Sequence, residues 1–297
     1  MKILITGITG YIGSHLAKDC LRKGWTVYGI ARPDSKTELL QKNGILSNVK
    51  IERTDGGVAS LQKIIQKAKP DLVFHMATLY VAEHQPQQVG SLIESNIRFG
   101  CELLEAMRAE GVDCLVSAET AWQFDPMGNI RPVNLYAATK EAFAVLNHFY
   151  EDAYGFRTIK FKLFDTYGGN DNRPKLLNKL REISKTGQVL ELSKGEQILD
   201  FTHIDDVTAA LCLGAKRVLL LKKGKCEEYV ISGYRLSLKN WIQKINQIMG
   251  SPLSVRLGAK PYRAREVMIP WPGGKKIKGW KCKVSPLQGL SLFFSLK

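Results

Sequence analysis

Short apolar runs alternate with longer segments of helical periodicity through the first half of the chain. The apolar runs, each of strand length, cover residues 3–6, 26–31, 49–51, 72–76, 114–117 and 158–164. The segments with apolar residues every three or four positions cover residues 14–23, 59–67, 91–109 and 136–151. Strands that alternate with helices in this way predict an α/β fold with a doubly wound parallel sheet.

The second half of the chain has a less regular pattern. Its expected helices cover residues 174–186, 205–215 and 238–248, and its expected strands cover 189–192 and 229–232. Because no repeat, low-complexity tract or flexible linker separates the halves, we expect the two parts to be interleaved. We predict a sheet domain over residues 1–166 and a smaller lobe mainly over 167–297, with about 199–222 returning to the core.

A glycine-rich turn lies between the first expected strand and the first expected helix. Gly7, Gly10 and Gly13 fall three residues apart. Gly7 permits a tight turn, Gly10 lets the backbone approach a pyrophosphate, and Gly13 lets the helix pack close to the strand. The N–H groups that begin the helix then face the anion. The order strand, turn and helix is that of a dinucleotide-binding fingerprint.

A tyrosine and a lysine share one face of the expected helix 136–151. Tyr136 and Lys140 are four residues apart, so their side chains lie one above the other. An ammonium beside a phenol favours the phenolate and lowers the pKa of the phenol from about 10. Such a phenol exchanges a proton near neutral pH while a nicotinamide exchanges a hydride. With the glycine turn upstream, this pair predicts a catalytic site.

With these two motifs the chain resembles the extended short-chain dehydrogenase/reductases, the nucleotide-sugar epimerases, dehydratases and reductases. The resemblance covers nearly the whole chain, through segments 71–78, 96–100, 164–169, 200–207 and 279–281. It implies a Rossmann-type sheet, a C-terminal lobe that closes over a nucleotide sugar, and a homodimer paired through helices 91–109 and 136–151. The cofactor-binding residues that the motifs and the resemblance indicate together are Gly7, Thr9, Gly10, Tyr11, Ile12, Gly13, Arg32, Lys36, Asp55, Ala77, Asn96 and Lys140.

The end of the second expected strand indicates which dinucleotide binds. A carboxylate there would accept hydrogen bonds from the ribose hydroxyls of NAD. This chain has Arg32 at that place and Lys36 just beyond it. A guanidinium matches a 2′-phosphate in charge and in fork geometry, so we expect NADP(H). NAD stays open as the alternative, because Asp34 is close enough to face the ribose after a small shift of the loop.

The chain departs from the family pattern beside the catalytic pair. The resemblance places a hydroxyl donor for the substrate carbonyl at position 118, which is alanine here. Ser117 or Thr120 must then supply the donor, and Thr120 is preferred because two residues along a strand share a face. Glu119 does not fall at the sequence position where the family's dehydratases carry their carboxylates. We therefore expect Glu119 to be solvent-facing or structural.

Among the family's branches, the chain most resembles the synthases of CDP-abequose and CDP-paratose, which reduce 4-keto sugars. Segments 156–175, 192–201 and 258–268 carry this likeness. Leu199 replaces an arginine that contacts the nucleotide diphosphate in many relatives, so a cation in a substrate-side loop is expected to take that role. The substrate-binding residues expected from this resemblance are Thr78, Asn172, Arg173, Lys175, Gln197 and Arg263.

The composition limits the classes of partner and the cellular compartment that we expect for the protein. The net charge of +15 is spread along the chain, with no basic stripe interleaved with aromatics, so we expect polyanionic small molecules and no nucleic acid. No apolar stretch reaches the ~20 residues of a membrane span, and the N-terminus does not have the pattern of a signal peptide. The six cysteines are scattered, which predicts reduced thiols and no metal site. A cytoplasmic enzyme without membrane partners is expected.

The expected activity is NADPH-dependent reduction of a 4-keto-6-deoxy nucleotide sugar for deoxysugar or surface polysaccharide synthesis. In the branch that the chain resembles, the sugar is linked to CDP. A 4-epimerase that retains NAD uses the same residues and is the main alternative. A 4,6-dehydratase is less favoured because of the position of Glu119. A non-catalytic dinucleotide sensor is favoured only by Ala118 and opposed by the Tyr136–Lys140 pair.

Overall fold

A seven-stranded parallel sheet forms the centre of the computed structural model, which describes residues 1–295. Its strand order is β10-β6-β5-β4-β1-β2-β3, and every neighbouring pair is parallel. The strands are β1 (Lys2–Thr6), β2 (Thr26–Ala31), β3 (Lys50–Arg53), β4 (Leu72–His75), β5 (Cys114–Thr120), β6 (Arg157–Leu163) and β10 (Cys226–Ile231). The predicted Rossmann-type α/β fold is confirmed.

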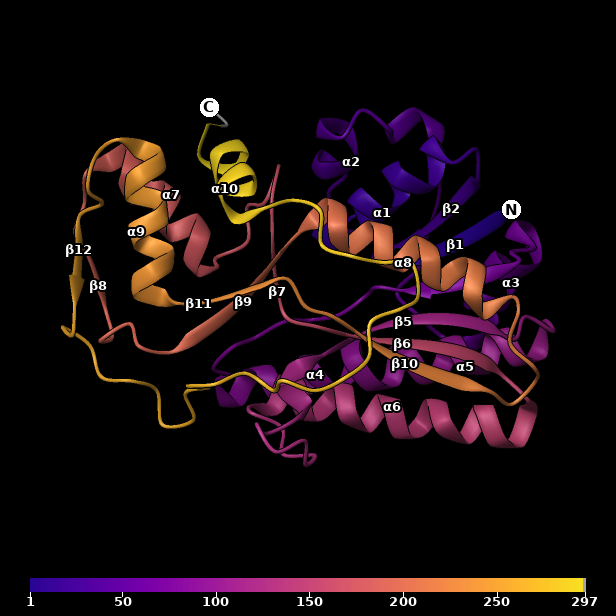
Figure 1. Ribbon diagram of the computed structural model, residues 1–297. Coiled ribbons are helices and arrows are strands. Elements are labelled where there is room, and N and C mark those ends of the chain that lie inside the picture. The colour runs from indigo at the N-terminus through magenta and orange to yellow at the C-terminus, as the bar shows by residue number, and fades with distance from the viewer. Residues whose placement is uncertain (296–297) are drawn as a thin grey trace.

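Helices cover both faces of this sheet (Figure 1). One layer contains α1 (Tyr11–Arg22) and α8 (Ile204–Val218), which pack against each other. The other layer contains α3 (Val58–Ala68), α5 (Phe99–Ala109) and α6 (Leu135–Tyr154). The short helix α2 (Glu38–Lys42) follows β2. Crossover helices on both faces explain why the strands are apolar on both sides.

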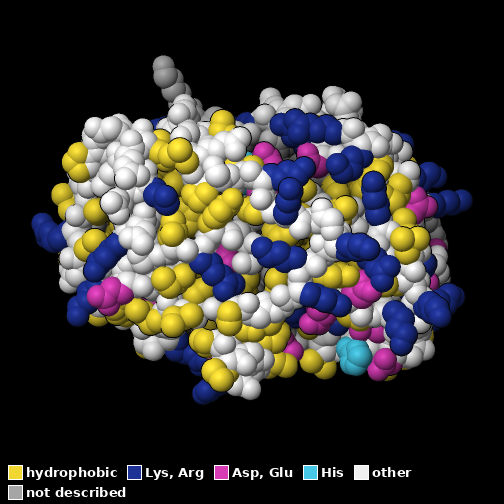
Figure 2. All heavy atoms as spheres, in the orientation of Figure 1, with side chains coloured by type: hydrophobic (Ala, Val, Ile, Leu, Met, Phe, Trp, Pro, Cys, Tyr) yellow, Lys and Arg dark blue, Asp and Glu magenta, His cyan; other side chains and the backbone are white. Residues whose placement is uncertain are grey.

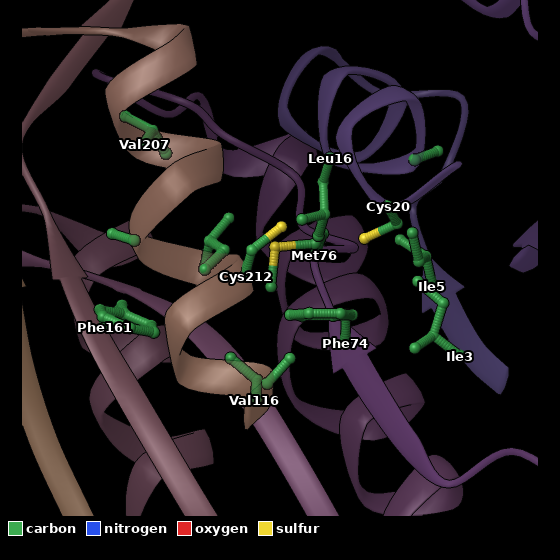
Figure 3. Close-up of a cluster of buried hydrophobic side chains, with 14 of the residues drawn as sticks. Ile3, Ile5, Leu16, Cys20, Phe74, Met76, Val116, Phe161, Val207 and Cys212 are labelled. Carbon is green, nitrogen blue, oxygen red and sulfur yellow. The ribbon is translucent and has the colours of Figure 1, made fainter. Parts of the chain in front are cut away.

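The α1–α8 layer is held by a buried apolar cluster (Figure 3). Leu16 and Cys20 of α1 point toward Cys212 of α8, with Phe74 and Met76 from the end of β4 between them. These side chains are at most 8% exposed, so α8, from the second half of the sequence, is part of the core. The apolar face of residues 204–218 therefore packs on the central sheet, whose first strands come from the first half of the sequence.

The remaining elements form a smaller lobe at one end of the sheet (Figure 1). It has two small sheets, in the orders β11-β9-β7 and β12-β8. Its strands and helices are β7 (Asp165–Tyr167), α7 (Leu176–Thr186), β8 (Leu190–Leu192), β9 (Ile198–His203), β11 (Tyr234–Ser237), α9 (Leu238–Met249), β12 (Val255–Leu257) and α10 (Pro286–Ser295). Trp241 and Phe293, which are fully buried, belong to the core of this lobe.

A long segment without regular structure, residues 258–285, runs from β12 past the end of the sheet to α10; we call it the strap (Figure 1). Asp206 of α8 fastens the strap to the core. Its carboxylate accepts hydrogen bonds from the backbone N–H groups of Lys283 and Val284, each at 3.0 Å, and its carbonyl accepts one from the Trp280 indole at 2.8 Å. The motif residues around 206 and 280 therefore meet in space.

Three features of the secondary structure differ from the sequence prediction. The expected helix 91–109 is divided into α4 (Val89–Ile93), a π-helical turn (Glu94–Arg98) and α5. β5 continues to Thr120, and β10 begins at Cys226, three residues earlier than expected. β7, β9, β11 and β12 were not predicted as strands, because short strands of mixed polarity give no clear alternation.

The surface carries the charge that the composition predicts. Figure 2 shows Lys and Arg side chains distributed over one face, more densely on the half that carries α1 and α8. Some rest on aromatic rings, such as Lys275 over Tyr229 at 5.2 Å and Lys276 over Trp280 at 5.3 Å. Within residues 1–295, no helix is both long and apolar enough to cross a bilayer.

Candidate active site

The glycine turn brings the start of α1 close to the end of β4. Gly7 has φ +66°, and a Cβ atom there would lie 2.8 Å from the backbone of Ala77. A Cβ at Gly13 would lie 2.2 Å from the Gly7 carbonyl oxygen, and the Gly10 N–H donates to that oxygen at 2.9 Å. Only glycine fits at positions 7 and 13, so the turn has the cradle shape that a dinucleotide pyrophosphate needs.

One cavity joins this turn to the predicted catalytic residues. It has a volume of about 490 Å³, and Gly7, Gly13, Ala118, Thr120 and Tyr136 all contribute to its walls. The other predicted residues in its walls are Thr9, Gly10, Tyr11, Ile12, Lys36, Thr78, Asn172, Arg173 and Lys175. The carboxyl ends of parallel strands meet here, which is where open α/β sheets bind ligands.

A second cavity, of about 680 Å³, adjoins the first. Trp122, Phe164 and Asp165 line both cavities, so the two adjoin, and we call them together the chamber. Arg263 of the strap lines the second cavity and lies 3.3 Å from Glu83 on the opposite wall. A chamber of this size accommodates a ligand much larger than a dinucleotide's nicotinamide end alone.

Tyr136 lies in the first turn of α6. Asn134 begins that helix by accepting a hydrogen bond from the Ala137 N–H at 2.9 Å. The Tyr136 ring is 9% exposed and meets the Tyr80 ring edge-on, with centroids 5.1 Å apart. Burial raises the pKa of Tyr136 to about 12, and hydrogen bonding by Thr78 opposes the increase.

The expectation that the pKa of this phenol is lowered is wrong, because burial raises it. The nearby charges that affect Tyr136 are Arg173, which lowers its pKa, and Asp165, which raises it. Lys140 is 2% exposed, and burial lowers its own pKa to about 8. The phenol and the ammonium share a helix face, but the desolvation of each outweighs their interaction.

Asn96 fastens α6 to the loop after β4. Its side-chain oxygen accepts hydrogen bonds from the Thr78 hydroxyl at 3.0 Å and the Leu79 N–H at 2.7 Å. Its amide donates to the Leu79 carbonyl at 3.0 Å and to the Thr139 hydroxyl at 2.9 Å. These contacts position Thr78 beside Tyr136, and the π-helical turn presents Asn96 for them.

The two candidate hydroxyl donors have different surroundings. Thr120 is extended, at φ −132° and ψ 140°, and lines the cavity together with Ala118. Its oxygen accepts the Trp122 N–H at 3.2 Å, which leaves its hydrogen available for a ligand. Ser117 is fully buried, its hydroxyl has no partner within residues 1–295, and it is outside the cavity walls.

The loop after β2 carries the predicted specificity residues. Arg32 is 76% exposed at its side chain and lies 3.7 Å from Asp34, while Lys36 reaches the cavity wall. Arg53 shapes this loop by donating to the carbonyls of Arg32 and Pro33, both at 2.8 Å. No sequence signal indicated Arg53, because its partners are backbone atoms.

The remaining predicted residues are distributed around the chamber. Arg173 pairs with Asp171 at 2.7 Å and stacks on the Tyr11 ring at 4.0 Å. Lys175 pairs with Asp165 at 2.8 Å. The predicted residues outside the walls of both cavities, among those described, are Arg32, Asp55, Ala77, Asn96, Ser117, Lys140 and Gln197.

Sequence reasoning missed a buried ion pair next to the site. Glu119 of β5 pairs with Lys162 of β6, and both residues are 3% exposed. Glu119 is therefore not solvent-facing but held in a buried ion pair, and it also contributes to the wall of the first cavity. Its partner is 43 residues away in sequence, so only the strand register, which sets Glu119 opposite Lys162, reveals the contact.

Comparisons with known proteins identify the family of the chain. Residues 3–231 match the model of the NAD dependent epimerase/dehydratase family. A CDP-abequose synthase of Yersinia pseudotuberculosis is 27% identical over 91% of this chain and 92% of its own length. Protein CapI of Staphylococcus aureus is 29% identical over 71% of this chain and 68% of its own length.

The fold is shared with solved structures. The UDP-glucose 4-epimerase of Thermotoga maritima has a TM-score of 0.85 and 22% identity, covering 99% of this chain and 97% of that one. Because the family model spans most of the chain, the family expected from the sequence is confirmed. The protein belongs to the NAD dependent epimerase/dehydratase family, and it is an enzyme of that family.

Proposed function

We propose that this enzyme reduces a 4-keto-6-deoxy nucleotide sugar with NADPH, and that the nucleotide is CDP. The observation that carries the proposal is the first cavity, whose walls contain both the glycine turn and Tyr136 and which adjoins a second cavity. The likeness to CDP-abequose synthases over more than nine-tenths of the chain supports the substrate class. Arg32 and Lys36 support NADPH through the charge of its 2′-phosphate.

The residues present fit a dinucleotide. The close backbone approach at Gly7 and Gly13 leaves the α1 N–H groups open to a pyrophosphate. NADPH supplies, when bound, a hydride to the carbonyl carbon of the sugar and is oxidised to NADP⁺. Tyr136 donates its phenolic proton to the carbonyl oxygen as that oxygen gains the carbonyl electron pair, so the ketone becomes an alcohol. Thr120 donates a hydrogen bond to the same oxygen.

The charge state of Tyr136 favours reduction over the first step of epimerisation. Burial raises its pKa to about 12, so the phenol carries its proton at neutral pH and acts as an acid. An epimerase must first oxidise its substrate, which needs the phenolate as a base. Lys140 is proposed to hold the nicotinamide ribose through its ammonium.

A 4-epimerase that retains NAD is the second candidate. Curated relatives include the UDP-glucuronate 4-epimerase of Thermodesulfobacterium geofontis, at 24% identity over 97% of this chain. Asp34 lies in the loop that would contact the ribose. A 4,6-dehydratase is not favoured, because Lys162 holds the Glu119 carboxylate.

The test is a fluorescence titration of the purified enzyme with NADPH and with NADH, followed by a CDP-linked 4-keto-6-deoxy sugar. We expect tighter NADPH binding and oxidation of NADPH when the sugar is added. Arg32→Ala should weaken NADPH binding about tenfold and leave NADH binding unchanged. Arg22→Ala, on an exposed arginine of α1, is the matched control. Copurified NAD with no net oxidation would establish the epimerase instead.

A further inference from the structure

A second tyrosine packs against Tyr136 at the first cavity. The Tyr80 ring meets the Tyr136 ring edge-on, with centroids 5.1 Å apart and an angle of 78° between the two ring planes. Both residues line the cavity, although no sequence signal indicated Tyr80. An edge-to-face arrangement at this distance is favourable for two aromatic rings. The contact therefore restricts the motion of the Tyr136 ring.

The backbone around Tyr80 is fastened on both sides. Before it, the Leu79 N–H donates to the Asn96 side chain at 2.7 Å, and the Leu79 carbonyl accepts from the Asn96 amide at 3.0 Å. After it, the Ala82 carbonyl accepts from the Asn134 amide at 2.8 Å. Asn134 begins α6. The loop that carries Tyr80 is therefore tied to the helix of the proposed proton donor, although the loop has no regular structure.

A cation holds the side chain of Tyr80. Tyr80 is 39% exposed, so packing alone does not fix its ring. The Lys175 ammonium lies over that ring, 5.1 Å from its centroid, and 2.8 Å from the Asp165 carboxylate. A cation is attracted to the face of an aromatic ring, and a carboxylate beside the cation keeps it in place. Both charged residues belong to the smaller lobe, at β7 and at the start of α7.

Every link from Asp165 to Tyr136 is thus a direct contact. The carboxylate pairs with Lys175, the ammonium covers the Tyr80 ring, and that ring meets Tyr136. Lys175 was expected to bind the substrate, but its charge is already balanced by a carboxylate. A balanced charge attracts a distant phosphate less than a free one does. The arrangement favours a role for Lys175 within the protein.

We propose that Tyr80 is a positioning residue, which holds the Tyr136 phenol in its reactive orientation, and that the Asp165–Lys175 pair holds Tyr80 in turn. Small displacements of a reacting group lower a reaction rate strongly, so a restrained phenol transfers its proton faster than a mobile one. The effect on turnover rests on the proposed function. The motion of the Tyr136 ring is measurable without any ligand.

The first experiment measures that motion by NMR on protein with ¹³C-labelled tyrosine rings. The Tyr136 signals are assigned by their loss in Tyr136→Phe. Tyr80→Leu should raise the rate of Tyr136 ring flips about five- to tenfold, because the edge-to-face contact is lost. Lys175→Met should raise that rate about two- to threefold. The conservative variants Tyr80→Phe, which keeps the ring, and Lys175→Arg, which keeps the cation, should restore slow flipping.

The second experiment measures reduction of the CDP-linked 4-keto-6-deoxy sugar. Tyr80→Leu should lower kcat about tenfold and Lys175→Met about threefold, with the KM for the sugar and the NADPH affinity within about twofold of the unmodified enzyme. Tyr80→Phe and Lys175→Arg should recover most of the rate. A raised KM with an unchanged kcat would mean that the two side chains bind the substrate, which overturns the proposal. Faster ring flips with an unchanged kcat overturn it as well.

Lys179→Met is the matched control. It removes an exposed lysine one turn further along α7, outside both cavities, and should change neither the ring flips nor kcat. Ring flips of Tyr136 that stay as slow in Tyr80→Leu as in the unmodified protein contradict the proposal. Should Tyr80→Leu fail to fold, the comparison of Lys175→Met with Lys175→Arg decides. If the unmodified enzyme reduces no sugar, the proposed function fails, while the ring flips still decide whether Tyr80 restrains Tyr136.

Discussion

The two cavities of the chamber are built in different ways. The first is shaped by backbone, with Gly7 and Gly13 in such close contact that no side chain fits. The second is lined in part by the strap, whose Arg263 pairs with Glu83 from the segment after β4; their side chains are 54% and 69% exposed. The backbone-built cavity accepts one kind of ligand, whereas the strap-built cavity can change its ligand through substitutions that leave the fold intact.

Tyr136 lines the first cavity, and its loss should have the largest effect. Tyr136→Phe keeps the ring against Tyr80 but removes the proton donor. We expect turnover to fall about 10³- to 10⁴-fold with NADPH affinity within about twofold of the unmodified enzyme. Stopped-flow oxidation and fluorescence titration measure the two quantities. Loss of NADPH binding in Tyr136→Phe would place the reacting group elsewhere.

The Thr120 hydroxyl, in the wall of the first cavity, should have the next largest effect. Thr120→Val preserves shape and removes the donor, so we expect kcat to fall about 10²-fold with dinucleotide affinity unchanged. Ala118→Ser added to Thr120→Val should restore part of that rate, because both positions line the cavity. Ser117→Ala is the comparison, and a loss of rate in Ser117→Ala alone would identify Ser117 as the donor.

The backbone contacts of the first cavity can be broken directly. A methyl group at residue 13 would overlap the Gly7 carbonyl, so Gly13→Ala must move α1. We expect NADPH affinity to fall at least about tenfold and the free energy of unfolding to fall by about 1–3 kcal/mol. Gly90→Ala is the control, because a Cβ there meets nothing within 4 Å, and it should be neutral or slightly stabilising. Unchanged NADPH binding in Gly13→Ala would contradict the close contact between residue 13 and the Gly7 carbonyl.

The difference between contacts made by neighbouring residues and contacts made by distant segments explains which features could be predicted from the sequence. The glycine turn was predictable because a few neighbouring residues determine it, and the register of Thr120 was predictable from the period of a strand. The pairing of Glu119 with Lys162 was not, because it depends on which strands become neighbours. Nor was the raised pKa of Tyr136, which follows from burial by distant segments. The path of the strap was not predictable either, because it lacks regular structure, although segments 258–268 and 279–281 of it carried part of the family resemblance.

The strap should show the smallest effect, because its contacts with the chamber are exposed. Arg263→Ala removes one cation from the second cavity, and exposed ion pairs contribute at most about 1 kcal/mol. We expect the KM for the nucleotide sugar to rise about three- to fivefold, with kcat and the KM for NADPH unchanged. Arg256→Ala, at an equally exposed ion pair with Glu191 outside both cavities, should change neither KM. A change in the KM for NADPH alone would mean that the strap belongs to the dinucleotide site and that the two cavities are not separate in function.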